Sequence, residues 1–485
     1  MDLRVKVGGL EDVVLSEPVS TTGQYFNSSV LSISILCVME FENPFDDSTS
    51  LALVNDVFLP INPRFSSIMV EDKQGGKQWK RVEVNAEDHI RIPCFPEGLS
   101  TESYDHCFND YLSKMAKDPL PQTKPLWEIH IIKYPTSNAS GNVVFKLHHS
   151  LGDGYSLMCA LLSCLQRADN PSLPLTLPIF RNSLKPEKVP KSIISRVPQV
   201  LSCALNTVMD FGWSVLKSSF LEDRRSPIHS GNKGVEFNPI NITTITFSLD
   251  QIKQIKSCLH VSHPSQYIVT QTINDVICGI IFLGTRLYMD VTSEEAKNES
   301  STALVLLNTR YINGFKSLNE MCQNQESKSL WGNKFAFLHI SLPQLHQYDE
   351  SLKPLKFVQE IQSIIKRKRN SAAVYLTGML LESMRKYRGP EAAAQYVHNT
   401  IRNPSMAVTN MIGPVEKMAL SNQPVKGLYF MVVNSPQSLV VTIMSYMDQL
   451  RVTIGAETGF IDPVKFRTCT EKAFSMIFDA AMKSK

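Results

Sequence analysis

The chain has 485 residues with a formal net charge of +3, and 43% of its residues are hydrophobic. One compact core does not extend over such a length, so two large lobes are predicted, and the near-balanced charge gives no support to nucleic-acid binding by bulk electrostatics. The ten cysteines form no C-x-x-C pair, which indicates reduced thiols in an intracellular compartment.

The N-terminal part combines a polar leader with a strongly apolar segment. Residues 1–25 are mostly polar and lack the apolar core of a signal peptide, so none is predicted. Val30–Glu40 is apolar and β-branched, which predicts a buried strand. The next predicted elements are a helix over Leu51–Val57, strands over Phe65–Val70 and Trp79–Val84 joined at Gly75–Gly76, and a helix over Thr101–Lys117.

Two apolar segments then predict a hairpin that leads into the most informative stretch of the chain. Leu126–Ile132 and Val143–Leu147 read as paired strands around a polar turn, with Trp127 as a core anchor. The second strand runs into His148–Gly154 (HHSLGDG), and a helical pattern follows from Leu157. Catalytic residues often lie on such loops, because the flanking elements hold them rigidly.

The chemistry of this loop favours acid–base catalysis over metal binding. An imidazole has an unperturbed pKa of about 6.5 and can take a proton from a hydroxyl near neutral pH. Adjacent residues at a strand end face opposite sides, so we expect at most one of His148 and His149 to reach a substrate. Gly152 and Gly154 around Asp153 predict a tight turn with unusual backbone angles. No metal site is predicted, because the spacing lacks an i, i+4 histidine pair and a third ligand.

A change of composition follows this motif. Ala168–Lys191 contains five prolines and is interpreted as an interlobe linker or loop. Ile193–Phe220 is apolar but is interrupted by Asp210, which would be costly inside a membrane-spanning helix. We therefore predict an amphipathic helix that lies on a membrane or on the protein surface, with packing in the core as the alternative.

The second half of the chain alternates strands and helices. The predicted helices are Leu249–Cys258, Thr270–Leu287, Leu352–Arg388 and Pro463–Met482. A first strand is predicted to begin at Ile242. The further predicted strands are Thr302–Thr309, Phe335–Leu342, Ala407–Ile412, Gly427–Val433, Leu439–Tyr446 and Arg451–Ala456. Asn274 and Asp275 fall inside an apolar helix, where unpaired polar groups are unfavourable, so both are expected to have partners. Lys366–Arg369 is interpreted as a solvated basic face, with anionic lipid headgroups or CoA phosphates as the functional alternatives.

The string His148–Gly154 resembles the HHxxxDG signature of the CoA-dependent acyltransferase superfamily. Other stretches narrow the resemblance to the wax ester synthase/diacylglycerol acyltransferase family, and most closely to its plant members. They occur in the order and near the spacing of that family and comprise Pro125–Ile129 (PLWEI), Asn274–Gly279 (NDVICG), Gly332–Asn333 and Asn410–Pro414 (NMIGP). The resemblance covers nearly the whole chain.

The resemblance implies an α/β (α+β) fold of two chloramphenicol-acetyltransferase-like lobes, with mixed sheets flanked by helices and an active-site tunnel between the lobes. We accordingly predict an N-terminal lobe over residues 1–166, a linker region over 167–241 that holds the helix candidate 193–220, and a C-terminal lobe over 242–485.

The resemblance also assigns roles to residues. His149 is the general base that deprotonates the acceptor hydroxyl, and its imidazolium then protonates the departing CoA thiolate without an acyl-enzyme. His148 is structural, and Gly154 lets the backbone approach the base. Asp153 holds the loop by pairing with an arginine, for which Arg310 is the candidate. Asn274, beside Asp275, is a candidate for substrate positioning or oxyanion stabilisation, with a purely structural hydrogen bond as the alternative.

The family's substrates complete the expectation. Fatty acyl-CoA is the acyl donor, and the acceptor is a fatty alcohol or diacylglycerol, with wax ester synthesis placed first. No metal or bound cofactor is expected, a membrane surface is the expected partner, and the expected location is the cytosolic side of the endoplasmic reticulum membrane, with the plasma membrane as a second site. The oligomeric state stays open.

Two other functions were weighed against this one. A BAHD-type acyltransferase with a soluble hydroxyl acceptor is suggested by Asp210–Trp213 (DFGW), but that family carries the motif close to the C-terminus, whereas here it lies before the midpoint. A catalytically silent lipid-binding relative is disfavoured by the intact histidine motif.

Overall fold

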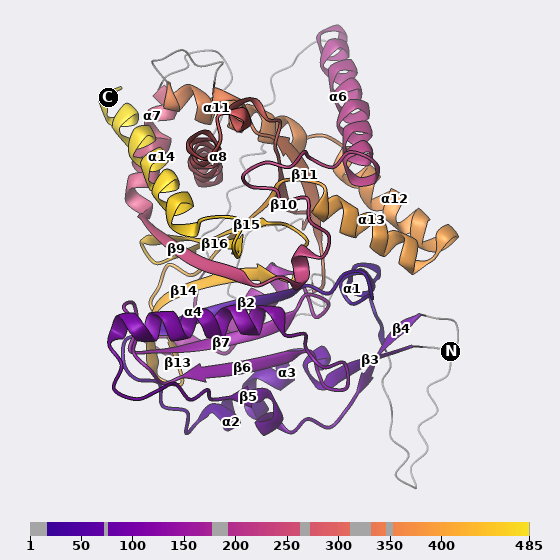
Figure 1. Cartoon of the computed structure of the whole chain (residues 1–485). Helices are drawn as coiled ribbons and strands as arrows, with labels where there is room; N and C mark the ends of the chain where they lie inside the picture. Colours follow the sequence, from indigo (N-terminus) through magenta and orange to yellow (C-terminus); the bar gives the residue numbers. More distant parts are fainter. Residues whose placement is uncertain are drawn as a thin grey trace.

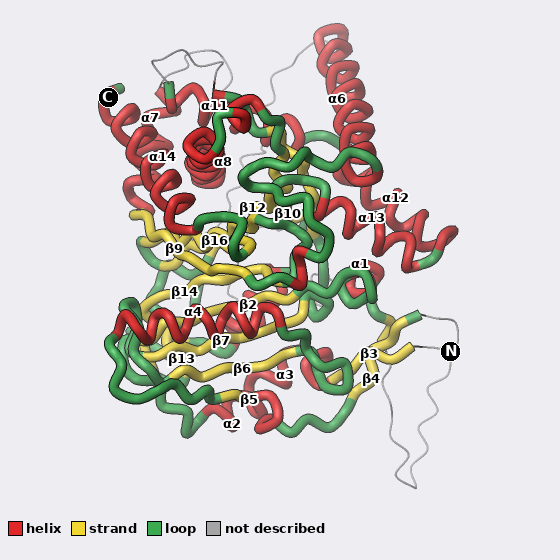
Figure 2. Tube along the Cα trace, in the orientation of Figure 1, coloured by secondary structure: helices red, strands yellow, loops and turns green. Residues whose placement is uncertain are grey.

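The computed structural model describes residues 17–71, 76–176, 193–261, 272–310, 331–345 and 353–484. Residues 1–16 of the predicted leader, Gly75 of the predicted turn, and residues 177–191 of the predicted linker lie outside the described residues. In the described part, the chain forms two large sheets with helices around them (Figures 1 and 2).

The first large sheet has seven strands, and most of its long strands are buried. Its order is β5 (Ile90–Arg91), β6 (Trp127–Ile132), β7 (Gly141–His148), β2 (Ser34–Phe41), β14 (Gln423–Val433), β13 (Met418–Leu420) and β8 (Gln166–Arg167). The predicted hairpin is present, since β6 and β7 pair antiparallel with Trp127 opposite Leu147. Trp127 is 0% exposed and its indole N–H donates to the carbonyl of Phe65 at 2.8 Å, so its prediction as a core anchor is confirmed.

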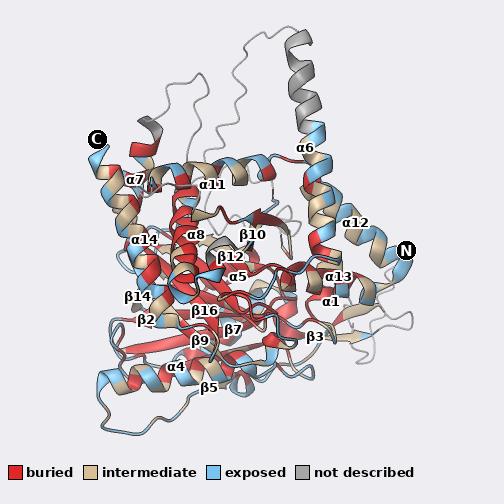
Figure 3. Cartoon of the chain, turned by 45° about the horizontal axis from the view of Figure 1, so that its top comes forward, coloured by how far each residue is buried: buried red, intermediate tan, exposed pale blue. Residues whose placement is uncertain are grey.

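The second large sheet has six strands and is mixed. Its order is β11 (Phe335–Ser341), β10 (Thr302–Asn308), β12 (Met406–Ile412), β15 (Leu439–Tyr446), β16 (Gln449–Glu457) and β9 (Ile240–Ser248). β12 runs parallel to both β10 and β15, and the other neighbours are antiparallel. Helices that share a core with this sheet are α7 (Leu249–Val261), α8 (Ile273–Thr292), α11 (Pro354–Arg369) and α14 (Pro463–Lys483). Figure 3 shows α8 as mostly buried, which fits its nearly unbroken apolar sequence.

The two sheets share an apolar core. Side chains of β2 and β14 pack there with those of the second sheet, among them Ala407 and Val440, and with helix α4 (Thr101–Lys117). The buried Glu40 of β2 also accepts two hydrogen bonds from Arg451 of β16, at 2.9 and 2.8 Å. The sheets therefore meet through both apolar packing and a buried ion pair.

Sheet membership and chain order differ in one segment. Residues 418–433 follow strands of the second sheet in the sequence, yet β13 and β14 belong to the first sheet, where β14 pairs with β2. The division at residues 166 and 241 remains a prediction about chain regions, and this crossing segment ties the C-terminal region to the sheet that carries the histidines.

Predicted helix Leu352–Arg388 is two helices, which corrects the expectation. The first, α11, ends at Arg369, and the second, α12 (Ala373–Arg388), begins after a break at Asn370–Ser371. The Ser371 hydroxyl accepts the backbone N–H of Ala373 at 3.2 Å, and such local side-chain bonds compete with helix propagation. After Gly389, α13 (Pro390–Arg402) follows, a helix that the sequence patterns did not predict.

The predicted surface helix is present as α6 (Ile193–Ser219), which contacts α12 and α13. Asp210 and Lys368 form an ion pair at 3.2 Å, so the aspartate of the DFGW stretch has a structural role. Lys368, a member of the basic cluster Lys366–Arg369, is therefore buried and not solvated. Within the described residues, no helix is long and apolar enough to cross a membrane.

Candidate active site

His149 lies directly after the last residue of β7, an interior strand of the first sheet. Phe335 of the second sheet is close to the ring of His149. The backbone N–H of His149 donates to the carbonyl of Ile33 at 2.9 Å, and the residue is 5% exposed. Its ring contacts Phe26 and Phe335, at centroid distances of 4.4 and 5.6 Å, and these two rings also contact each other at 5.9 Å. The imidazole therefore sits in an apolar enclosure at the junction of the two sheets.

One amide fixes the tautomer of His149. The Nδ2 group of Asn333 donates to the backbone carbonyl of His149 at 3.0 Å, which turns its Oδ1 toward the imidazole Nδ1 at 2.9 Å. Because an amide oxygen only accepts, Nδ1 must carry the proton. In the neutral ring, Nε2 then holds the lone pair, and it has no hydrogen-bond partner within the described part of the chain.

The environment keeps His149 neutral. Burial lowers its pKa below the usual histidine value, and this outweighs the opposing influence of the nearby Asp153 charge and of the hydrogen bond to Asn333. A neutral imidazole with a free Nε2 lone pair is the form that a general base requires.

His148 is in the opposite tautomer and is enclosed by polar partners. The N–H of Ser150 donates to its Nδ1 at 3.2 Å, so Nε2 carries the proton and donates to the Ser32 hydroxyl at 3.1 Å. The residue is 1% exposed, and burial lowers its pKa to about 3. Both ring nitrogens are engaged, which supports the structural role predicted for this histidine.

Asp153 caps the helix that follows the motif and pairs with the predicted arginine. Its carboxylate accepts the N–H of Ser156, which begins α5 (Gly154–Ser163) from the N-cap position. Arg310 donates to both carboxylate oxygens, at 2.6 and 2.9 Å, and the two side chains are 0% and 6% exposed. No hydrogen bond joins Asp153 to His149 among the described residues, and the carboxylate also accepts the backbone N–H of Lys334 at 2.9 Å.

The two motif glycines serve close packing, which corrects the prediction of unusual backbone angles. Neither has a positive φ. A Cβ on Gly152 would lie 2.9 Å from the Ser156 Cβ, and one on Gly154 would lie 2.6 Å from the Met411 sulfur of β12. Gly154 therefore allows the second sheet to approach the start of α5.

Asn274 and Asp275 lie at the start of α8 and not in its interior, which corrects their predicted surroundings. Asp275 and Thr272 form a capping box, in which each side chain accepts the other residue's backbone N–H. Asn274 is exposed, and its amide contacts that of Asn410. No hydrogen bond joins Asn274 to His149 in the described structure.

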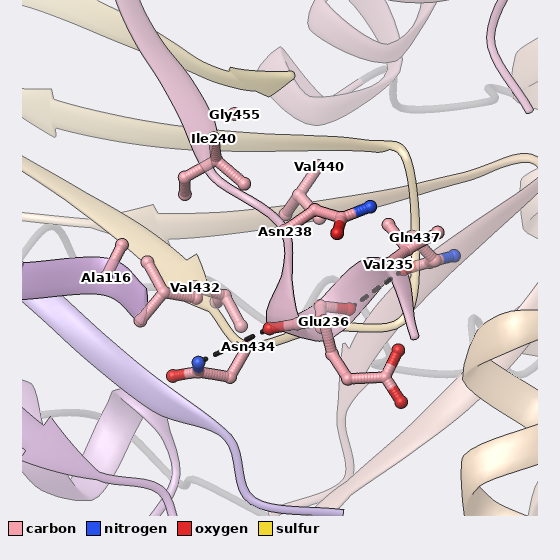
Figure 4. A pocket seen from close by; sticks show the side chains of 12 residues that line it. Ala116, Val235, Glu236, Asn238, Ile240, Val432, Asn434, Gln437, Val440 and Gly455 are labelled. Carbon is pink, nitrogen blue, oxygen red and sulfur yellow. Dashed lines mark hydrogen bonds between the residues drawn. The ribbon is translucent and has the colours of Figure 1, made fainter. Parts of the chain in front are cut away.

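A pocket lies beside the end of β14 and the start of β9 (Figure 4). It is lined by the end of β14, whose Val433 pairs with Ser34, the partner of His148. Its polar lining includes Glu236, Asn238, Asn434 and Gln437. In the described parts of the chain, no group of three or more His, Cys, Asp or Glu side chains is arranged to hold a metal ion.

The roles of Asn333 and its neighbours were not predicted from the sequence. The sequence marks Gly332–Asn333 only as a family-like dipeptide, and Phe26 directly follows the segment assigned to the polar leader. The one available signal was the family resemblance of the dipeptide, because Asn333 is 184 positions from His149 and no local pattern links them.

Comparisons with known proteins agree with the sequence resemblance. Residues 58–263 match the model of the wax ester synthase/diacylglycerol acyltransferase catalytic domain, and residues 331–478 match the WS/DGAT C-terminal domain. Two relatives come from Arabidopsis thaliana. Wax ester synthase/diacylglycerol acyltransferase 4 is 28% identical to this chain, and the alignment covers 96% of this chain and 91% of the relative. Wax ester synthase/diacylglycerol acyltransferase 7 is 29% identical, and the alignment covers 93% of this chain and 94% of the relative.

Solved structures share the fold at lower identity. The wax ester synthase/diacylglycerol acyltransferase of Marinobacter aquaeolei VT8 matches with a TM-score of 0.57 at 15% identity, over 96% of this chain and 100% of that one. The starter condensation domain of rhizomide synthetase matches with a TM-score of 0.52 at 11% identity, and the match covers 95% of this chain and 92% of that one. At this identity the matches show the fold alone, and they confirm the predicted two-lobed class with mixed sheets and helices.

Proposed function

Because the chain belongs to the wax ester synthase/diacylglycerol acyltransferase family and is an O-acyltransferase, we propose that Nε2 of His149 is the general base of its reaction. The acceptor hydroxyl gives its proton to Nε2 while its oxygen attacks the thioester carbonyl of a fatty acyl-CoA. The tetrahedral intermediate then expels CoA thiolate, which takes the proton back from the imidazolium. The products are the ester and CoA, and the histidine returns to its starting state.

The lowered pKa of His149 suits both halves of this cycle. At neutral pH the ring is uncharged and ready to accept a proton. Once protonated, a histidine of low pKa is a stronger acid than a thiol, whose pKa is about 8.5, so proton return to the thiolate is downhill. The same burial that makes the base weak thus makes its conjugate acid effective in the second step.

Family membership sets the substrate classes, which are acyl-CoA as donor and a fatty alcohol or diacylglycerol as acceptor. Our further proposal is that wax ester synthesis is the main activity and that the enzyme works on the cytosolic face of the endoplasmic reticulum membrane, with the plasma membrane as a second site. The apolar contacts of His149 with Phe26 and Phe335 support long-chain substrates.

Two supporting roles complete the proposal. Asp153 and Arg310 hold the histidine loop, supported by their buried bidentate pair. Asn274 is our candidate for acceptor positioning or oxyanion stabilisation, supported by its exposed amide in the first turn of α8, where the helix dipole favours negative charge.

The observation that carries the proposal is the Nε2 of His149, which has no hydrogen-bond partner among the residues that the structure describes, and a product assay tests it. Membranes that contain wild type, His149→Ala or His106→Ala receive labelled palmitoyl-CoA with either a fatty alcohol or diacylglycerol. His106 is an exposed residue of α4 and serves as the control. Loss of an imidazole base lowers the rate by about two to four orders of magnitude, so only His149→Ala should lose its product. Equal product from His149→Ala would refute the assignment of the base.

A further inference from the structure

Helix α6 turns charged groups toward the protein and large apolar groups toward solvent. Asp210 pairs with Lys368 at 3.2 Å, and Lys217 pairs with the buried Asp223. Ser214 lies 3.4 Å from the buried His339 through its hydroxyl. Surface helices ordinarily place their apolar side inward, so this reversal makes the outer side of α6 unusual.

The outer side of α6 is continuous with that of α12. The exposed apolar residues of α6 are Leu205, Val208, Met209 and Leu216, and their separations of three, one and seven positions place them on one side of the helix. The N–H of Ala372 donates to the Thr207 hydroxyl at 3.3 Å, which joins the start of α12 to α6. We define the α6–α12 surface by Leu205 (57% exposed), Val208 (69%), Met209 (71%) and Leu216 (45%) on α6, by Phe220 (78%) directly after α6, and by Tyr375 (72%), Leu376 (36%) and Met379 (67%) on α12.

Basic residues accompany this surface. Residues 366–388 contain seven lysines and arginines and one acidic residue, Glu382. Arg367 lies 3.5 Å from Asp210 of α6 while its side chain remains 52% exposed, and Lys386 and Arg388 are exposed at the end of α12. An apolar surface with cations beside it is complementary to a membrane interface that contains anionic lipids.

The inner side of α12 leads toward the candidate base. Leu381 and Met384 of α12 pack on an apolar cluster that includes Phe26, and Phe335 and Phe337 pack on the same cluster. Phe26 and Phe335 are the two rings that contact His149. One helix thus presents apolar side chains to the exterior and also packs on the apolar surroundings of the site.

We propose that the α6–α12 surface docks the enzyme on an anionic lipid membrane, with its apolar side chains among the acyl chains and its basic residues at the headgroups. Lipid acceptors would then enter along α12 toward Phe26, Phe335 and His149. This proposal rests on the proposed function for the nature of the acceptor, but membrane docking itself can be measured without catalysis.

The test compares two matched substitutions. The double variant Val208→Asp/Met209→Asp places charge on the surface, whereas Val464→Asp changes a residue of equal exposure on α14, since Val208 and Val464 are each 69% exposed. Flotation with phosphatidylcholine vesicles that contain phosphatidylserine measures docking, and thermal unfolding verifies the fold. We expect the double variant to lose about tenfold or more of its partitioning, while Val464→Asp floats as wild type does.

Further arms separate the possible failures. A Lys386→Glu/Arg388→Glu variant should lose the preference for anionic over purely zwitterionic vesicles. The double variant should retain activity with a water-soluble short-chain alcohol and lose activity on acceptors in vesicles. His149→Ala should float normally and make no ester, so a wrong base and a wrong docking surface give different results. Normal flotation of the folded double variant would overturn the proposal. It would also be overturned if the wild type were a dimer and the double variant a monomer, because this surface would then be an interface between two copies.

Discussion

Opposite changes at Asn333 should move the pH dependence of catalysis in opposite directions. Asn333 holds Nδ1 of His149 through its amide oxygen at 2.9 Å, and this hydrogen bond raises the histidine pKa against the larger effect of burial. Asn333→Ala removes that contribution, so the pKa falls further. Asn333→Asp replaces the amide by a carboxylate, whose charge favours the imidazolium and raises the pKa.

The size of the rate effect follows from one hydrogen bond. A bond of this type contributes about 0.5–1.5 kcal/mol, and each 1.4 kcal/mol corresponds to a factor of about ten. Asn333→Ala should therefore lower kcat/KM by about two- to tenfold, because the ring can rotate or shift to the tautomer without a lone pair on Nε2. This loss is far smaller than the two to four orders of magnitude expected of His149→Ala.

The assay is kcat/KM against pH, with Asn109→Ala as the control on the exposed side of α4. A base must be neutral, so activity disappears as pH falls through its pKa. The acidic limb should therefore shift to lower pH in Asn333→Ala and to higher pH in Asn333→Asp, while the control is unchanged. If both variants lose activity with no shift of the limb, Asn333 is only a structural contact and the tautomer argument is wrong.

Two predictions concern stability. Arg310→Met leaves the buried Asp153 carboxylate without its cation and should lower the free energy of unfolding by about 3–5 kcal/mol, measured as a large fall in the thermal midpoint. The control Arg467→Met breaks an exposed pair with Glu471 and should barely change the midpoint. Burial lowers the pKa of His339 to about 3, so the unfolded chain protonates first and stability is lost as pH falls from about 6.5 toward 3. His339→Leu should weaken this loss, and an unchanged dependence of the midpoint on pH would contradict it.

The sequence predicted most elements because their patterns are local. β15 and α4 have the expected bounds, and the hairpin that carries the histidines pairs as predicted. The failures arise where tertiary context decides. Nothing local places β14 beside β2 in the other sheet, and the break at Asn370–Ser371 involves a local hydrogen bond from Ala373 to Ser371 that a helical pattern does not show.

The site was predicted in its chemistry and only partly in its geometry. The pairing of Asp153 with Arg310 could be expected, because a buried carboxylate requires a cation and the family supplies one. The prediction of unusual backbone angles at the motif glycines was wrong, and Gly154 instead lies against Met411 of β12, a contact between distant segments. Asn333 could not be found by spacing for the same reason.

Assembly of the two lobes gives His149, the proposed base, its defined tautomer. Four consecutive residues of the second half contact the histidine loop: Trp331 donates to Leu151, Gly332 to Ser156, Asn333 to His149, and Lys334 to Asp153. Arg310 adds its buried pair from the same side. Separation of the lobes would break all of these contacts together and would free the imidazole to rotate or change tautomer. The proposed general base therefore depends on the interface between the lobes, and variants that loosen this interface should reduce catalysis even where they leave His149 in place.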